Sequence, residues 1–455
     1  MTTPKILLVG GSGFIGHHLG IHLSQAHFKL NLLTRTLKPS GMLSFPAKQF
    51  QWDIAKGVPN NALEGVSHII NLAGESIGEG RWTKEKKEKI VASRVQITRE
   101  IVKAANKGGK IRTLVQASAI GFYGNTGDQK VMETHSVGAG FLAETTKKWE
   151  EELAQLQEKI RPVIVRLGVV LGHAGGALSD MLMPYQMGIG ATIGPGDQFL
   201  SWIHVADVCQ FIERVLGNES DRGIYNLTAP KPVTYRELHG KLQRYYSALS
   251  WAQIPPMVLK MVLGQRSELL LTGQQVMPQK LVESGYRHRF PEIDSCLENL
   301  LGKMHDGCQI FEQTQWVPAS LSSVWDFFSH EENLKKVTPP ELDLEVTICP
   351  ETRLNSHRLI DFRIRFYGFP IKWRSKIIEF VPPTSFRDVQ LTGPYKIWDH
   401  HHEFKELDGG TLIVDYVRFK PPFGIIGKFL TPIISMQVGK IFQFRRKALS
   451  EFFRE

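Results

Sequence analysis

The sequence predicts an α/β domain built on a doubly wound parallel sheet, followed by an α+β domain. Up to about residue 230, short apolar runs of strand length alternate with longer stretches of helical periodicity, as expected for strands joined by crossover helices. A glycine-rich turn follows the first apolar run directly. From about residue 308, the pattern changes to successive strand-like segments that end in one long helix.

The length of 455 residues exceeds that of one ordinary domain. The changes of pattern predict a large α/β domain over residues 1–235, a small lobe over 236–302 and a further domain over 308–455.

The net charge of +10 does not indicate a nucleic-acid partner, because the basic residues are dispersed and the densest run, Lys84–Lys89, alternates with glutamate. Cys209, Cys296, Cys308 and Cys349 lack metal-type or redox spacing and indicate a reducing compartment. The N-terminus enters a core strand without room for a signal peptide, and no stretch approaches the roughly 18 apolar residues of a membrane span. We therefore expect a cytoplasmic protein.

The first strand and its turn predict a dinucleotide site. Lys5–Val9 has the pattern of a buried strand, and three glycines spaced by three residues open a helix predicted over 14–26. Glycine permits the sharp turn and the close approach of backbone to a pyrophosphate, which the N–H groups of a helix N-terminus then bind. The expected cofactor contacts are Gly10, Gly13, Phe14, Ile15 and Gly16.

The end of the second strand, Lys29–Arg35, indicates which dinucleotide binds. An acidic residue at this place would bind the ribose of NAD, but the strand ends in Thr34 and Arg35. A guanidinium suits a 2′-phosphate, so NADP is predicted, with NAD and a merely solvated arginine as the alternatives. A third strand ending at Gln51–Ile54 would place Asp53 at the adenine amino group.

Further apolar runs and helical stretches complete the α/β pattern, and their motifs carry a family resemblance. The chain resembles the extended short-chain dehydrogenase/reductase superfamily in its NAD(P)-dependent epimerase/dehydratase-like branch, over about residues 4–300. Its Gly74–Ile77, Arg81-Trp82 and Ser93-Arg94 are similar to an atypical subfamily of epimerases without a known substrate. This resemblance implies a Rossmann fold with a small C-terminal substrate lobe. The elements are strands over 68–74, 113–118, 162–168 and 224–227, and helices over 84–107 and 142–159; the other matching motifs are Asn71–Gly74, Ser118 with Tyr123-Gly124, Arg166–Gly168, Trp202–Val208 and Tyr225–Leu227.

The resemblance also assigns site residues. It implies cofactor contacts from Leu72, Ala73, Gly74 and Arg94, and substrate contacts from Glu75, Arg81 and Arg166. Glu75 would serve as a general base or a polar anchor and Arg81 as an anion binder, with a loop salt bridge as the alternative. Members of the family often pair through helices such as 84–107 and 142–159, which leaves a homodimer open.

The family's chemistry requires a tyrosine and, four residues later, a lysine that lowers the pKa of the phenol. In the expected window, Phe141 pairs with Thr145 in one register and Leu142 with Thr146 in the other, so the usual pair is missing. Ser118 matches the family's helper serine, which would orient a substrate oxygen. Tyr123 is the nearest substitute for the missing tyrosine, and an aromatic lid over the cofactor or substrate is its alternative role.

His204 is an acid/base candidate by residue type. The resemblance favours a structural role for the segment Ile203–Val208, with Asp207 capping a helix.

The last 150 residues resemble the START-like helix-grip family, also called the polyketide cyclase/dehydrase-like superfamily. A strand is expected over 310–317, then a capped helix within 318–328, then six strands and a final helix over 433–453. The resemblance implies a curved sheet and a final helix that enclose an apolar cavity for a lipid, quinone or other hydrophobic ligand. Pro421–Gly424 would form a loop at its mouth.

His400, His401 and His402 form a histidine run. On a strand, alternation places His400 and His402 on one face and His401 on the other with Asp399 and Glu403. With no other acid or cysteine at ligand spacing, a binding surface or cavity wall is favoured and no metal site is expected.

Two functions follow from these observations. The first is an NADP-dependent oxidoreductase or epimerase of atypical type, acting on a small substrate of unknown identity, with a hydrophobic one left open, and carrying a fused domain that binds a hydrophobic ligand. The alternative is a non-catalytic NADP(H)-binding sensor or carrier coupled to a lipid- or quinone-like ligand.

Overall fold

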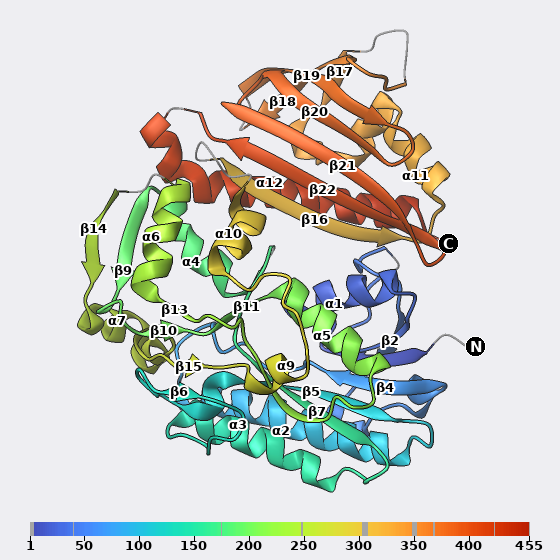
Figure 1. Ribbon diagram of the computed structural model, residues 1–455. Coiled ribbons are helices and arrows are strands. Elements are labelled where there is room, and N and C mark those ends of the chain that lie inside the picture. Colours follow the sequence, from blue (N-terminus) through green and yellow to red (C-terminus); the bar gives the residue numbers. More distant parts are fainter. Residues whose placement is uncertain are drawn as a thin grey trace.

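Two seven-stranded sheets, one parallel and one antiparallel, organise the chain (Figure 1). The computed structural model describes residues 4–39, 41–173, 175–246, 249–302, 308–347, 353–366, 369–422 and 424–454. The parallel sheet lies in the first part of the chain and the antiparallel sheet in the last, as the change of pattern near residue 308 predicts.

All neighbouring strands of the first sheet pair in parallel. The chain begins in the middle of the sheet at β1 (Lys5–Val9) and proceeds outward to β2 (Lys29–Thr34) and β3 (Lys48–Gln51). It then crosses to β4 (Val66–Asn71) on the other side of β1. This is the predicted doubly wound order, and it places the reversal point, where such folds bind ligands, between β1 and β4. In spatial order the strands are β12 (Gly223–Leu227), β7 (Arg161–Leu167), β5 (Thr113–Ala119), β4 (Val66–Asn71), β1 (Lys5–Val9), β2 (Lys29–Thr34) and β3 (Lys48–Gln51).

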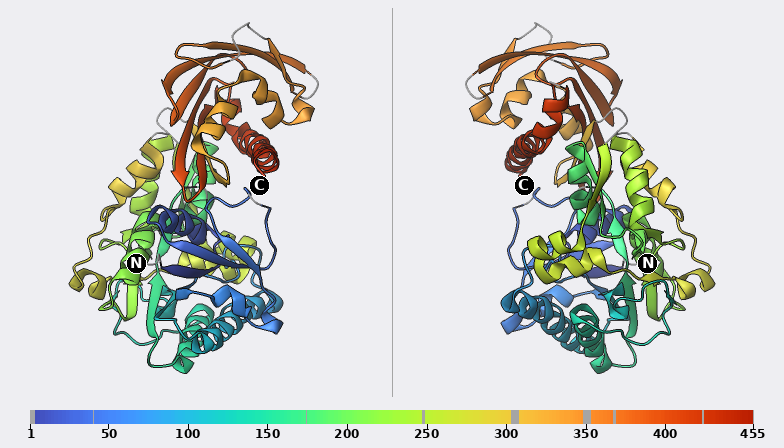
Figure 2. Two further views of the ribbon diagram at one scale, coloured as in Figure 1. Left: turned by 90° about the vertical axis from the view of Figure 1, so that its right-hand side faces the viewer. Right: turned by 90° about the vertical axis from the view of Figure 1, so that its left-hand side faces the viewer.

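The second sheet is antiparallel throughout and curves around the helix that closes the chain, α12 (Gly424–Phe452) (Figure 2). The helix begins nine residues before the predicted position 433, because it continues through Pro432 at the expense of one backbone hydrogen bond. α11 (Leu321–Phe328) is the capped helix expected within 318–328, and the structure shows that Ser320 is its N-cap residue. In spatial order the strands are β16 (Gln309–Val317), β22 (Gly410–Lys420), β21 (Ile397–Leu407), β20 (Ser385–Thr392), β19 (Phe369–Val381), β18 (Leu359–Phe366) and β17 (Glu345–Thr347).

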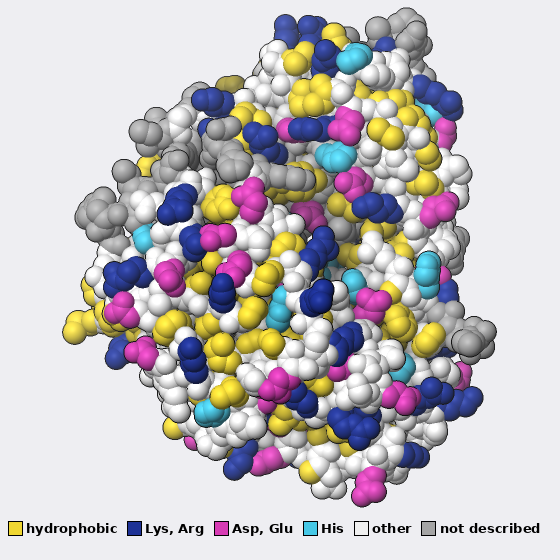
Figure 3. All heavy atoms as spheres, in the orientation of Figure 1, with side chains coloured by type: hydrophobic (Ala, Val, Ile, Leu, Met, Phe, Trp, Pro, Cys, Tyr) yellow, Lys and Arg dark blue, Asp and Glu magenta, His cyan; other side chains and the backbone are white. Residues whose placement is uncertain are grey.

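The surface carries charges of both signs, interspersed over the face shown in Figure 3. Among the described residues, no helix combines the length and the apolar character that crossing a membrane requires. Cys209, Cys296 and Cys308 are buried free thiols, and Cys349 falls outside the described ranges.

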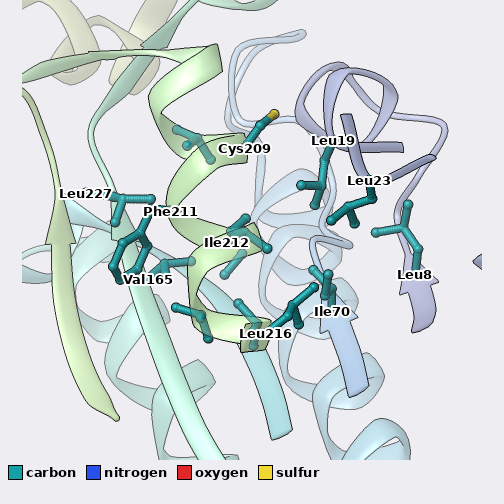
Figure 4. Packing of buried hydrophobic residues seen from close by; sticks show 14 of the residues in the cluster. Leu8, Leu19, Leu23, Ile70, Val165, Cys209, Phe211, Ile212, Leu216 and Leu227 are labelled. Carbon is teal, nitrogen blue, oxygen red and sulfur yellow. The ribbon is translucent and has the colours of Figure 1, made fainter. Parts of the chain in front are cut away.

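Helices cover both faces of the parallel sheet. α1 (Phe14–Gln25) contacts α5 (Val205–Gly217) on one face, and α2 (Lys84–Lys107) contacts α3 (Phe141–Glu151) on the other. α2 has the predicted bounds, whereas the helix predicted over 142–159 ends at Glu151 and a 3₁₀ turn leads into β7. Figure 4 shows the packing between α1, α5 and the strands, with Leu8, Leu19, Leu23, Ile70, Val165, Cys209, Phe211, Ile212, Leu216 and Leu227 labelled.

A smaller lobe lies beside the carboxyl edge of the parallel sheet. One buried cluster unites α4 (Gly176–Gln186), α6 (Tyr235–Tyr246) and α10 (Ile293–Leu301), so it joins segments from both sides of residue 235. The remaining elements of this part are β6 (Lys130–Val131), β8 (Val169–Leu171), β9 (Ile189–Ile193), β10 (Phe199–Leu200), β11 (Trp202–His204), β13 (Val233–Thr234), β14 (Leu249–Ile254), α7 (Pro256–Leu263), α8 (Glu268–Leu271), β15 (Gln275–Val276) and α9 (Gln279–Glu283).

The last domain docks on the first through β16 and α12. The N–H of Trp316 donates to Leu43 O (3.0 Å), and the side-chain amide of Gln315 donates to Gly41 O (2.7 Å). From α12, Arg446 donates to Met42 O at 2.9 Å. The segment after β2, which belongs to the first domain, is therefore hydrogen-bonded to two elements of the last domain.

Candidate functional site

The glycine turn between β1 and α1 is shaped by contacts that only glycine permits. Gly10 has φ +84°, and a Cβ added there would lie 2.8 Å from Ala73 N. A Cβ at Gly16 would lie 2.3 Å from Gly10 O. The turn therefore packs directly against the chain that leaves β4, at the reversal point of the sheet.

Gly13 differs from these two glycines. It is the N-cap residue of α1 in an extended conformation, and a Cβ there would meet only Gly10 O at 3.4 Å. Because Gly13 has no side chain, the first turn of α1 receives no side-chain cap, and its N–H groups are left for an anion. Phe14, Ile15 and Gly16 form that turn, as the sequence predicts.

The chain leaving β4 supplies the opposite wall. Leu72 N donates to Val9 O (2.9 Å), Ala73 N donates to Asn71 Oδ1 (3.2 Å), and Gly74 lies against the guanidinium of Arg94. Burial lowers the pKa of Arg94 to about 10, so it remains a cation at neutral pH. Its guanidinium lies over the Trp149 ring, 5.1 Å from the centroid.

The end of β2 presents Thr34 and the exposed side chain of Arg35 at the same edge. Asp53 lies after β3, which ends at Gln51 rather than at the predicted Ile54. The Asp53 carboxylate caps the following turn by accepting from Ala55 N at 3.1 Å. The predicted adenine contact of Asp53 stays a prediction.

Ser118 and Arg166 are neighbours on β5 and β7, and both bind one carboxylate, that of Glu150 on α3. The Ser118 hydroxyl donates to Glu150 Oε1 at 2.5 Å. Arg166 donates to Glu150 Oε1 and Oε2 at 2.9 and 2.8 Å. Side-chain exposure of 3% for Arg166 and 10% for Glu150 shows that this ion pair is buried.

Tyr123 extends the network. Arg166 donates to the Tyr123 hydroxyl (2.9 Å), which in turn donates to Asn226 Oδ1 (2.7 Å). Burial raises the pKa of Tyr123, which makes it a poorer proton donor. Catalytic roles for Ser118 and Tyr123 and a substrate contact of Arg166 stay predictions; in the structure all three side chains are buried and paired within the protein. Sequence reasoning missed Glu150.

The loop after β4 carries the other two predicted substrate residues. Glu75 forms an ion pair with Lys86 at 2.7 Å, and this hydrogen bond lowers the pKa of the Glu75 carboxyl. A lowered pKa makes Glu75 a weaker base and favours the polar-anchor role. Arg81 donates to the carbonyls of Met261 and Val262 on α7, so it connects this loop to the small lobe.

His204 has the structural role that the sequence favours. Its Nδ1 accepts from Ala206 N at 3.0 Å, so His204 itself is the N-cap of α5. The prediction that Asp207 caps this helix is wrong. The Asp207 carboxylate instead accepts from Arg289 N at 2.6 Å and from Phe290 N at 3.2 Å, which attaches α5 to the chain before α10.

One cavity borders the glycine turn, and a second lies in the last domain. The first, of about 630 Å³, is lined by Ser12, Gly13 and Phe14 and also by Gln313 and Arg446 of the last domain. The other, of about 590 Å³, lies between the antiparallel sheet and α12. Its wall is mainly apolar and aromatic, with Phe362, Trp373, Tyr395, Trp398, Ile434 and Ile441 among the lining residues, and Pro422 of the predicted mouth loop also lines it.

The second cavity ends at a group of charged side chains. Asp388, His400, His402 and Arg445 line it, and Asp415 lies behind the two histidines. His400 and His402 share a face as predicted. Burial opposes ionisation of Asp415, but Arg445 and the two histidines outweigh burial and hold its pKa well below the usual value. Sequence reasoning missed both acids and Arg445, because they lie on other elements.

Comparisons with known proteins identify the first two thirds of the chain. Residues 6–228 match the NAD dependent epimerase/dehydratase family, and residues 254–300 match a domain of unknown function, DUF1731. The chain is 36% identical over 301 residues to the epimerase family protein YfhF of Bacillus subtilis. The aligned residues cover 65% of this chain and 98% of YfhF. It is 33% identical to the chloroplastic SDR39U1 homolog of Arabidopsis thaliana, over 65% of this chain and 86% of that protein.

Among solved structures, human epimerase family protein SDR39U1 with NADPH superposes with a TM-score of 0.60 at 29% identity, covering 66% of this chain and 99% of that one. The fold and the site thus define a nucleotide-binding protein of the short-chain dehydrogenase/reductase type. The chain belongs, over its first 300 residues, to the NAD dependent epimerase/dehydratase family. The START-like resemblance of residues 308–455 stays a prediction.

Proposed function

We propose that this protein is an NADP(H)-dependent oxidoreductase or epimerase of atypical type, acting on a small hydrophobic substrate. The observation that carries the proposal is the uncapped N-terminus of α1 at Gly13, set against the chain leaving β4 at the reversal point of the sheet. Exposed Arg35 at the end of β2 favours NADP over NAD. The human relative SDR39U1 was crystallised with NADPH.

The bound dinucleotide would supply hydride chemistry, and the chain's own residues would position the reactants. The buried Glu150–Arg166 pair fixes the carboxyl ends of β5 and β7, where Ser118 and Tyr123 lie. Arg81 ties the loop after β4 to α7, so that loop and lobe form opposite sides of a substrate site. Glu75, held by Lys86, is the polar anchor in this arrangement.

The fused domain would hold a hydrophobic substrate, product or effector. Its cavity of about 590 Å³ has the size and the apolar, aromatic lining of a small-molecule site. Leu430 and Ile433 of α12 line the cavity and are also partly exposed, so they mark a route by which an apolar molecule enters.

A non-catalytic NADP(H) sensor or carrier is the second candidate function. It is favoured by Thr145 and Thr146, which stand at the lysine position of the usual pair in the two registers and donate to the helix backbone at Phe141 O and Leu142 O. The hydroxyls of Ser118 and Tyr123 are likewise paired within the protein.

NADPH oxidation with a panel of apolar aldehydes, ketones and quinones tests the enzyme. We expect turnover by the wild type and none by Gly13→Val, whose Cβ fits the turn while its methyls fill the space before the helix N-terminus. Tight NADPH binding without turnover across the panel would favour the sensor. Binding of a fluorescent lipophilic probe tests the apolar cavity separately. We expect the wild type to bind the probe and Ile434→Trp, whose larger side chain fills part of the cavity, to lose this binding.

A further inference from the structure

Three side chains from two neighbouring strands converge at the polar end of the cavity in the last domain. Asp388 on β20 is the register partner of His400 on β21, and His402 follows two residues later on the same face. Asp388 Oδ1 lies 3.8 Å from His400 Nδ1 and 3.9 Å from His402 Nε2. The three potential ligand atoms all lie within 4.8 Å of one another.

The opposite nitrogens of both imidazoles face a second carboxylate. Asp415 Oδ1, on β22, lies 3.1 Å from His400 Nε2 and 2.8 Å from His402 Nδ1. A neutral imidazole that carries its proton on the nitrogen facing Asp415 presents a lone pair on the nitrogen facing Asp388. His400 makes this hydrogen bond to Asp415, the orientation typical of histidines that bind metals, whereas His402 Nδ1 lies close to Asp415 without hydrogen-bond geometry.

Further contacts fix this geometry. Arg445 of α12 donates to Asp415 Oδ1 at 3.2 Å, so the acid behind the histidines keeps its charge compensated. The His402 ring stacks on Phe386, with centroids 4.2 Å apart. Two imidazole lone pairs and a carboxylate are thereby aimed at one small space, and that space opens on the apolar cavity.

We propose that Asp388, His400 and His402 bind one divalent transition-metal ion, whose remaining coordination positions face the cavity. Two imidazoles and one carboxylate are a ligand set for Zn²⁺ or Fe²⁺, and three protein ligands leave positions open, as in catalytic rather than structural metal sites. The ion would bind an oxygen atom at the polar end of a ligand whose apolar body occupies the cavity. This last step rests on the proposed apolar-ligand function, whereas metal binding does not.

The alternative is a buried ion-pair network that needs no metal. In that network the Asp415 contacts would suffice, and Asp388 would lie near the two histidines by chance of strand register. The two alternatives predict different affinities for Zn²⁺. A metal site binds Zn²⁺ with an affinity that depends on both Asp388 and His402, whereas a plain ion-pair network has no affinity for Zn²⁺.

The test is a titration of the chelator-treated full-length protein with Zn²⁺ against a chromophoric competitor, followed by Co²⁺ absorption spectroscopy. We expect one equivalent of bound metal and the visible bands of a low-symmetry Co²⁺ site. Asp388→Asn and His402→Gln each remove a proposed direct ligand and should weaken binding by more than the roughly tenfold to hundredfold that loss of a supporting outer group costs. His401→Gln is the matched control, since His401 lies between the two ligands on the opposite face of β21 and should leave the affinity unchanged.

Substoichiometric binding, or equal affinity in the wild type, Asp388→Asn and His402→Gln, would overturn the proposal. If a variant fails to fold, the Co²⁺ spectrum of the wild type still tests the proposal: the bands of a low-symmetry site would support it, and their absence would overturn it. NADPH binding at the glycine turn, measured on the same samples, separates this proposal from the proposed function, because His402→Gln should leave NADPH affinity unaltered.

Discussion

The Ser118 hydroxyl donates to Glu150 at 2.5 Å, in a network that also contains the buried guanidinium of Arg166. The serine expected to orient a substrate is therefore held by a carboxylate from α3. Glu150 thus connects the carboxyl ends of β5 and β7, through Ser118 on one strand and Arg166 on the other.

Removal of this carboxylate should destabilise the protein strongly. Glu150→Gln leaves Arg166 charged and buried without its ion-pair partner, which costs about 3–5 kcal/mol in comparable buried pairs. Urea unfolding of the full-length protein measures the change. Glu151→Gln is the control, because Glu151 is exposed and lies 3.8 Å from Lys147, so a loss of more than about 0.5 kcal/mol there would be unexpected.

The two glycines of the turn should respond differently to alanine. Gly16→Ala forces a Cβ to within 2.3 Å of Gly10 O and should lower the melting temperature and abolish NADPH binding together. Gly13→Ala places its Cβ at 3.4 Å and should keep the melting temperature while it weakens NADPH binding. Thermal unfolding with and without NADPH distinguishes them, and equal melting temperatures would contradict the assignment of Gly16 as a contact point.

The docking of the last domain should depend on Arg446. Arg446→Ala removes the donor to Met42 O and Ser44 Oγ, and the loss of hydrogen bonds from a charged group costs about 1.5–3 kcal/mol. Limited proteolysis should then cut between the domains faster than in the wild type. The exposed neighbour variant Lys447→Ala should be cut at the wild-type rate; acceleration in both would mean that the whole C-terminal end of α12 frays.

His204 should contribute to loss of stability in acid. Burial lowers its pKa to about 4, from the usual 6.5. Between pH 6.5 and pH 4, His204 is protonated in the unfolded chain but not in the folded chain. The contribution of His204 to the free energy of unfolding therefore falls by about 1.4 kcal/mol per pH unit as the pH drops through this interval. His204→Asn keeps an N-cap side chain without titration, and its unfolding free energy should depend less on pH in this interval.

Local pattern predicted most of the fold, but not the groups that meet at the sites. The bounds of α2 and the presence of a capped helix within 318–328 followed from capping and periodicity, which are local properties. Alternation also placed His400 and His402 on one face. Asp388 and Asp415 reach these histidines through strand register, which the sequence does not specify at this distance, and the pairing of Glu150 with Ser118 depends on how α3 packs against β5.

The most direct measurement is a calorimetric titration of the full-length protein with NADPH and with NADH, repeated on Arg35→Ala. We expect both nucleotides to bind at the glycine turn, with a clear preference for NADPH that Arg35→Ala removes. Failure of both nucleotides to bind the folded wild type would show that the glycine turn is not a dinucleotide site, and would leave the cavity between the antiparallel sheet and α12 as the remaining candidate site.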